Sequence, residues 1–121
     1  MTDEANKYLL VLTNMPDRET AIKLARSLVG KRLAACANVM DGCTSIFRWQ
    51  GEIQSEREVP VLIKTRADRF ASLQQEILAC HPYELPEIIA VSVEAGFQPY
   101  LDWVSAEVDA AAQTPTGGGP Q

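Results

Sequence analysis

One short segment of this sequence carries the residue types that could bind a metal ion. Cys80 and His81 are adjacent, and Glu84 and Glu87 follow shortly after them. A neutral imidazole, a thiolate and carboxylates together suit Cu(II) or Zn(II). The alternative is structural, because a histidine at a helix end can hydrogen-bond the last backbone carbonyls. The segment therefore predicts either a divalent-metal contact at Cys80 and His81 or a helix cap.

A second group of residues could line a cleft. Trp49, Phe47 and Tyr83 are aromatic, and such residues usually anchor cores or subunit contacts rather than stack on a ligand. Lys64 and Glu87 add charge near predicted strand ends, as do Arg48, Glu58 and Arg66. If several of these side chains meet the only histidine in one cleft, the expected ligand is an anionic metabolite or a metal.

The other cysteines offer little catalytic chemistry. Cys36 lies in a run of small residues, where a free cysteine usually packs as a small apolar side chain. Cys43 has no basic neighbour in the sequence to activate it as a nucleophile. The sequence also lacks the spacing of a Ser/His/Asp site, a glycine-rich phosphate loop or an HExxH site. We therefore expect a protein that is not an enzyme.

The composition excludes several classes of partner. The chain has 121 residues, is 46% hydrophobic and carries a net charge of −5, so it can bury a core but offers no basic stripe for nucleic acid. No apolar run approaches the roughly 20 residues that span a bilayer. The three cysteines show no CxxC spacing, which argues against a disulfide framework. We expect a cytoplasmic protein that binds neither nucleic acid nor membrane.

The elements that must position these residues begin with a buried strand at residues 8–13. Asp17 then stands where a helix N-cap is expected, and apolar residues at helical spacing predict a helix that ends near Gly30. Residues 33–49 predict one long strand, bent at Asp41 and Gly42. A turn at residues 50–52 leads into an antiparallel partner that ends near residue 65.

The second half of the chain repeats this order. Residues 66–79 place apolar side chains on one helical face, and Pro82 and Pro86 disfavour continuation of that helix. Residues 88–93 predict a fourth strand, and a terminal helix follows Pro99. We expect one domain over residues 1–112 and a disordered Gly/Pro-rich tail at 113–121.

This β-α-β-β-α-β order predicts an α+β fold, the ferredoxin-like split βαβ sandwich, with a C-terminal helix added. Two helices cover one face of a four-stranded antiparallel sheet in that fold. The long second strand, however, carries large or apolar side chains on both of its faces, including Ile46, Phe47 and Trp49. We therefore expect self-association to cover the remaining apolar surface.

Four stretches, in this order and spacing, carry a family resemblance. They are Pro16, Asp17 and Ala21, then residues 32–39 (RLAACANV), 44–53 (TSIFRWQGEI) and 81–88 (HPYELPEI). With residues 63–65 (IKT) and the pair Tyr100 and Trp103, the chain resembles the CutA family of divalent-cation tolerance proteins from about residue 7 to residue 109. The resemblance implies a ferredoxin-like homotrimer, similar in architecture to PII regulatory proteins, and a link to copper and other divalent ions.

The resemblance also implies a place for the metal. The copper ligands proposed in this family map onto Thr13, Cys80 and His81 in this sequence. A threonine hydroxyl is a poor copper ligand, so the chain departs from the pattern at Thr13. Two functions stay open: a homotrimer that binds copper-class cations, or a PII-like regulatory or scaffolding module with a small molecule or protein partner at intersubunit clefts lined by Trp49, Phe47, Lys64, Tyr83 and Glu87.

Overall fold

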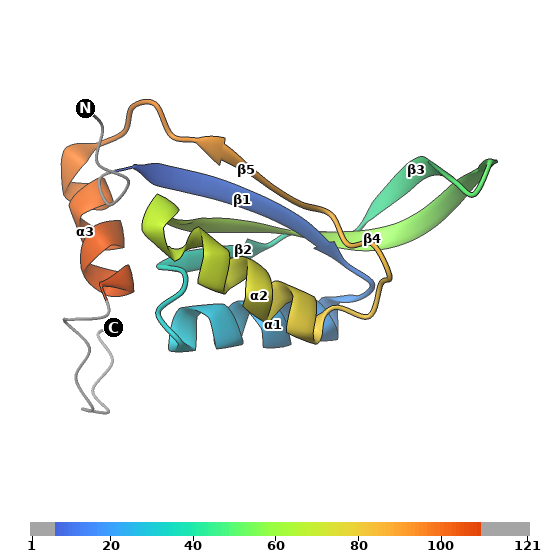
Figure 1. Cartoon of the computed structure of the whole chain (residues 1–121), viewed down its shortest axis with the longest axis horizontal. Coiled ribbons are helices and arrows are strands. Elements are labelled where there is room, and N and C mark those ends of the chain that lie inside the picture. The colour runs from blue at the N-terminus through green and yellow to red at the C-terminus, as the bar shows by residue number, and fades with distance from the viewer. Residues whose placement is uncertain (1–6, 110–121) are drawn as a thin grey trace.

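The computed structural model describes residues 7–109, and the predicted tail at 113–121 lies outside this range (Figure 1). The helices and strands follow the predicted order, with a short 3-10 turn before the second helix. They are β1 (Tyr8–Met15), α1 (Arg18–Gly30), β2 (Cys36–Val39), β3 (Cys43–Trp49), β4 (Glu52–Arg66), η2 (Ala67–Arg69), α2 (Phe70–Cys80), β5 (Ile88–Ser92) and α3 (Gln98–Val108).

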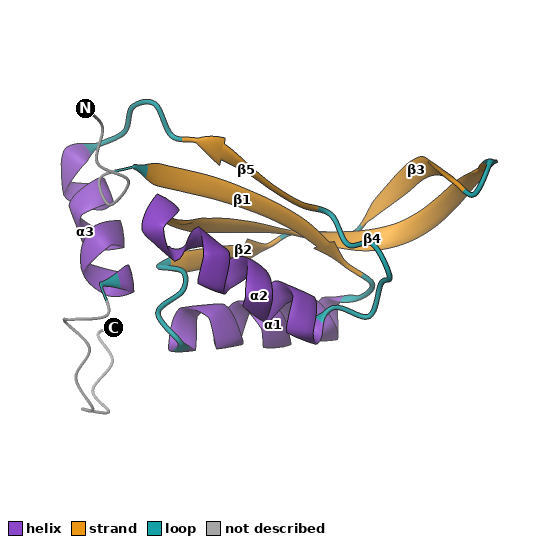
Figure 2. Cartoon of the chain, in the orientation of Figure 1, coloured by secondary structure: helices purple, strands orange, loops and turns teal. Residues whose placement is uncertain are grey.

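The four-stranded body of the sheet has the order β2-β4-β1-β5, and every pairing is antiparallel. Helices α1 and α2 lie together on one face of this sheet, as the ferredoxin-like prediction required (Figure 2). Asp17 is the N-cap of α1, because its carboxylate accepts a hydrogen bond from the Thr20 backbone N–H at 2.8 Å. The predicted fold is confirmed.

The core lies between the sheet and the two helices. Alternate residues of β1 and β4 point into it and meet apolar side chains of α1 and α2; the largest are Val11, Met15, Leu24, Leu28, Val61, Ile63, Leu73 and Ile77. Helix α3 covers one end of the molecule, where Val104 and Val108 pack with Ala35 and Tyr8. The structured body therefore rests on one continuous core and a small satellite cluster.

The predicted long second strand is divided in two. Strands β2 and β3 pair with successive parts of β4 and are separated at residues 40–42. The Met40 N–H donates to the Pro60 carbonyl at 2.9 Å, but proline has no N–H to return a bond, so the ladder stops there. The prediction of a bend at Asp41 and Gly42 located the break correctly, and its cause lies in the opposite strand.

Beyond the break, β3 and the first half of β4 project from the body as a two-stranded arm (Figure 1). Its tip is a tight turn in which Gln50 and Gly51 both have positive φ, 51° and 83°. Two consecutive positive φ values match the right-handed twist of a hairpin and favour glycine at the second position. The predicted turn at residues 50–52 is confirmed.

The sheet face opposite α1 and α2 is apolar and uncovered by the described part of the chain. The cross-strand pairs Leu12↔Leu62, Leu12↔Ile89 and Leu10↔Val91 place these side chains together on this open face. Ile89 and Val91 are 51% and 49% exposed, while the three leucines are half-buried. A contiguous apolar patch of this kind is typical of an interaction surface.

Candidate functional site

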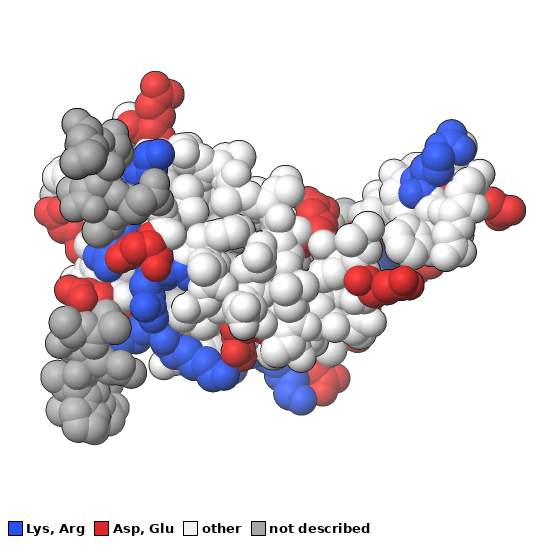
Figure 3. Space-filling view, in the orientation of Figure 1, with Lys and Arg blue, Asp and Glu red and all other residues white. Residues whose placement is uncertain are grey.

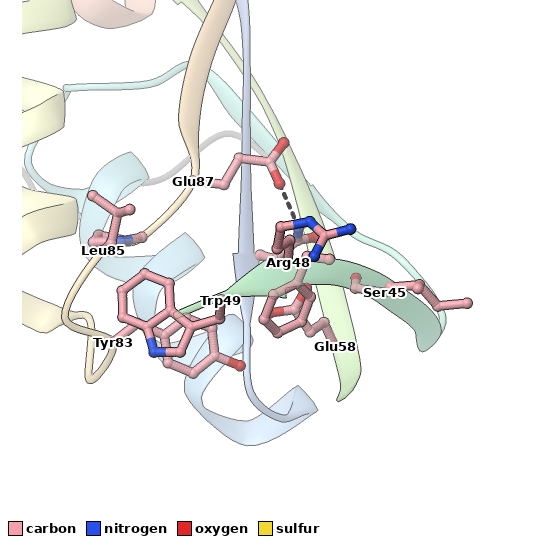
Figure 4. A pocket seen from close by; sticks show the side chains of 11 residues that line it. Ser45, Arg48, Trp49, Glu58, Tyr83, Leu85 and Glu87 are labelled. Atoms are coloured by element: carbon pink, nitrogen blue, oxygen red, sulfur yellow. Dashed lines mark hydrogen bonds between the residues drawn. The ribbon is translucent and has the colours of Figure 1, made fainter. Parts of the chain in front are cut away.

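A cleft of about 610 Å³ lies between the arm and the segment that joins α2 to β5. Trp49 and Phe47 enter it from β3 and Glu58 from β4, while Tyr83 and Glu87 enter from the opposite segment (Figure 4). The cleft thus brings together four of the five predicted cleft residues. Asn14, at the end of β1, also lines it, and its side-chain amide donates to Glu87 Oε1 at 2.7 Å.

The fifth predicted cleft residue, Lys64, lies elsewhere. Lys64 is paired with Leu10 and with Cys36, so its side chain belongs to the open face of the sheet. Its ammonium group donates a hydrogen bond to Asn38 Oδ1 and lies 3.9 Å from Cys36 Sγ. Lys64 therefore lies several residues along β4 from Glu58, the β4 residue that lines the cleft, and does not reach the cleft.

His81 fixes the segment that forms one wall of the cleft. Its Nε2 lies 2.5 Å from the Asn14 carbonyl, and the Tyr83 backbone N–H donates to its Nδ1 at 3.2 Å. Since Nδ1 accepts a hydrogen bond, Nε2 carries the proton and donates it to Asn14. Both ring nitrogens are therefore engaged, and His81 joins the end of β1 to the loop that carries Tyr83.

Tyr83 and Glu58 form the most buried polar contact of the cleft. Glu58 is only 8% exposed, and its carboxylate accepts a hydrogen bond from the Tyr83 hydroxyl. Burial, followed by this bond and the charges of Glu58 and Glu56, raises the pKa of Tyr83 to about 12. Tyr83 is therefore a neutral hydrogen-bond donor at physiological pH.

Cys80 ends α2 and faces away from the His81 hydrogen bonds, toward the preceding turn of its helix. Its Sγ lies 3.6 Å from Glu76 Oε2. Burial and then the negative charge of Glu76 raise the pKa of the Cys80 thiol. The neutral thiol is favoured, and a neutral thiol is a weaker metal ligand than a thiolate.

Thr13 is buried beneath the helical layer. It is 1% exposed, and its Oγ1 has no hydrogen-bond partner among the described residues. Its strand neighbour Asn14 points to the opposite face and reaches the cleft. The hydroxyl at the predicted ligand position is therefore a buried polar atom in an apolar core.

Thr13, Cys80 and His81 do not present a ready ligand set in this geometry. The threonine oxygen is enclosed in the core, the thiol lies against a carboxylate, and both imidazole nitrogens are engaged. Within residues 7–109, no group of three or more His, Cys, Asp or Glu side chains is arranged to hold a metal ion. Metal binding at these residues stays a prediction.

Two polar residues near the arm are not among the predicted site residues. Asn14 lines the cleft, and Glu56 lines an adjoining space beside Glu58 and Tyr83. Glu56 shares its alternation with Glu58, and the cross-strand pair Ser45↔Glu56 sets it on the same face of the arm as the aromatic residues. The alternation of side chains along a strand is the signal that could have identified Glu56. The position of Asn14 in the cleft depends instead on how the loop packs against the end of β1.

Nearly all of the described region matches a protein-family model. Residues 9–107 match the CutA1 divalent ion tolerance protein family. The chain belongs to this family. The resemblance noted from the sequence motifs is thereby confirmed for nearly all of residues 7–109.

Individual CutA proteins agree with this assignment. The divalent-cation tolerance protein CutA of Thermus thermophilus is 44% identical over 95 residues, which are 78% of this chain and 92% of that protein. The crystal structure of CutA from Xylella fastidiosa has a TM-score of 0.82 and 41% identity, covering 84% of this chain and 98% of that one.

A third relative differs in its described location. The periplasmic divalent cation tolerance protein CutA from Archaeoglobus fulgidus has a TM-score of 0.82 at 34% identity, over 84% of this chain and 99% of that one. In the chain described here, none of the helices within residues 7–109 is long and apolar enough to cross a membrane.

Proposed function

We propose that this protein acts in divalent-cation tolerance as a cytoplasmic homotrimer. The observation that carries the assembly is the open face of the sheet, with Leu10, Leu12, Leu62, Ile89 and Val91 uncovered. Burying such a surface against another copy stabilises by about 25 cal/mol for each Å² removed from water. A closed ring also protects strand edges that an open sheet leaves exposed.

The arm supports the same assembly. Ile46 and Ile53 lie on the face of the arm opposite Phe47 and Trp49, and they are 72% and 69% exposed. The basic residues Arg48 and Arg57 share that face, whereas the carboxylates lie on the other (Figure 3). A projecting arm with exposed apolar residues is best explained as a contact for a neighbouring subunit.

Sedimentation equilibrium tests the trimer directly. We expect a mass near three protomers at micromolar concentration, and Val91→Glu should shift it toward one protomer by placing a charge on the open face. Leu78→Glu is the matched control, because Leu78 is 50% exposed but belongs to α2. A single-protomer mass for the unaltered chain would refute the assembly.

For the metal, we propose a copper-class divalent cation at Cys80, with His81 joining once it releases Asn14 or Tyr83. Thr13 contributes only if its hydroxyl becomes accessible. Calorimetric titration with Cu(II) tests this assignment against Cys80→Ser and His81→Ala forms. Equal Cu(II) affinity for the unaltered protein and both variants would refute a metal site at Cys80 and His81. The tolerance function would then act without metal contact at these residues.

A second candidate is a PII-like regulatory or scaffolding module that binds a small molecule at the arm cleft. The specific observation in its favour is the cleft itself, lined by Phe47, Trp49 and Tyr83 with Asn14 and Glu87 bonded across it. Clefts of several hundred Å³ with aromatic walls and a few polar groups are typical of ligand sites. Neither candidate assigns a catalytic role to any residue.

A further inference from the structure

A smaller groove adjoins the arm cleft on the acidic side of the arm. Its volume is about 360 Å³, and it shares Phe47, Trp49, Glu58 and Tyr83 with the larger cleft. Two more carboxylates, Glu56 and Glu84, complete its wall. We refer to this space, enclosed by Phe47, Trp49, Tyr83, Glu56, Glu58 and Glu84, as the acidic groove.

The charge of the acidic groove is one-sided. Its remaining lining residues are Gln54 and Leu85, so no lysine, arginine or histidine contributes to its wall. Arg48 follows Phe47 on β3 and lines the neighbouring cleft instead, with its guanidinium directed to the Gly51 carbonyl at 3.5 Å. Three carboxylates therefore face a space that holds no compensating positive charge from the described residues.

Glu58 shows why this imbalance points to a ligand. It is more than nine-tenths buried, and its partner is the neutral Tyr83 hydroxyl rather than a cation. Among residues 7–109 no lysine or arginine lies within ion-pair distance of it. Burial of an ionised carboxylate is costly unless a positive charge or several hydrogen bonds compensate. A cation bound in the groove would supply that compensation.

The aromatic rings select the kind of cation. Phe47, Trp49 and Tyr83 border the same space, and the faces of aromatic rings attract organic ammonium and guanidinium groups. A bare metal ion fits less well, because these carboxylates do not form a metal-binding group in the described region. We propose that the acidic groove binds a small organic cation of the alkylammonium class.

This proposal rests on the second candidate function, ligand binding beside the arm, and not on metal binding at Cys80. Choline is a suitable probe because 3,3-dimethylbutan-1-ol has the same shape without the charge. Isothermal titration calorimetry should show choline binding at least about tenfold more tightly than the alcohol, as expected for a desolvated cation–π contact worth about 1.4 kcal/mol or more. Binding should weaken as salt is raised.

Matched variants locate the site. Glu58→Gln keeps an acceptor for the Tyr83 hydroxyl and removes the charge, and we expect a loss of about tenfold in choline affinity. Glu84→Gln, an exposed position, should also weaken binding without affecting folding. Glu52→Gln is the control, because Glu52 lies on the same face of β4 but outside the groove; its affinity should be unchanged.

Several outcomes would overturn the proposal: no heat with choline, equal binding of the uncharged alcohol, or unchanged affinity in Glu58→Gln. Binding of a lysine-containing peptide but not of choline would replace the small molecule with a protein partner. Sedimentation of the same samples separates this result from the assembly. A monomer that binds choline refutes the trimer alone, and a trimer that does not bind refutes the acidic groove alone.

Discussion

The His81 imidazole donates from Nε2 to the backbone carbonyl of Asn14, 67 residues earlier in the chain, at 2.5 Å. The same ring accepts from the Tyr83 N–H through Nδ1. The contact joins the end of β1 to the segment after α2. His81 is therefore a structural link in this geometry, and the metal contact proposed for it would compete with these two bonds.

The tautomer of His81 is directly measurable. His81 is the only histidine, so its side-chain ¹⁵N signals are unambiguous. In mildly alkaline solution we expect the neutral ring to carry its proton on Nε2, because Nδ1 accepts from Tyr83. A spectrum of the Nδ1-protonated tautomer would contradict the link. His81→Ala should also lower the free energy of unfolding by about 1–3 kcal/mol, since two hydrogen bonds are lost.

Thr13→Val should stabilise the protein. The substitution keeps the shape of the side chain and removes a hydroxyl that has no partner among the described residues, so we expect a gain of about 1–2 kcal/mol in urea denaturation. Thr65→Val is the matched control, because Thr65 Oγ1 is equally buried but donates to the Leu33 carbonyl at 2.7 Å. That variant should lose about 1 kcal/mol. Equal effects at the two positions would refute the distinction.

Trp49→Ala tests whether the arm anchors the assembly. Trp49 is half-buried in the single chain, and a subunit contact would bury it further. We expect dissociation of the trimer or a loss of about 3–5 kcal/mol, the range for large aromatic residues reduced to alanine. Trp103→Ala is the comparison, because Trp103 is 42% exposed on α3. A native trimer with unchanged melting after Trp49→Ala would exclude the anchor role.

Glu76 should make the free energy of unfolding depend on pH in acidic solution. Hydrogen bonds from Ser27 at 2.7 Å and Lys31 at 3.0 Å lower the pKa of the Glu76 carboxyl below its ordinary value of 4.5. The native state thus binds this proton less readily than the unfolded state. The stabilisation is complete above pH 4.5 and is lost as the pH falls through the lower native pKa.

Glu76→Gln provides the measurement. We expect it to cost about 1 kcal/mol near neutral pH, and the difference from the unaltered chain should shrink as the solution is acidified below the ordinary glutamate value. Exposed Glu19→Gln, in the first turn of α1, serves as a second glutamate for comparison. A difference for Glu76→Gln that stays constant down to acid unfolding would contradict the assignment.

The sequence by itself determined the elements and their order. The Asp17 cap, the turn at Gln50 and Gly51, and the stop after α2 depend on residues close together in the chain, whose preferences act locally. The apolar residues at 8–13 and the alternation that ends near residue 65 also predicted the two strands that became β1 and β4. These local preferences agree with one another, which is why the family fold could be read before the structure.

Only the tertiary structure decided which side chains meet. Tyr83 and Glu58 come from a loop and a strand far apart in the chain, while Lys64, a neighbour of the arm in sequence, lies on another surface. His81 and Cys80 are adjacent in the chain. The His81 ring nevertheless bonds Asn14 of β1, whereas the Cys80 thiol lies against Glu76 of its own helix, α2. The spacing of residues along a helix or strand determines which face each side chain lies on. Whether side chains from different elements meet depends on how those elements pack and where the backbone turns.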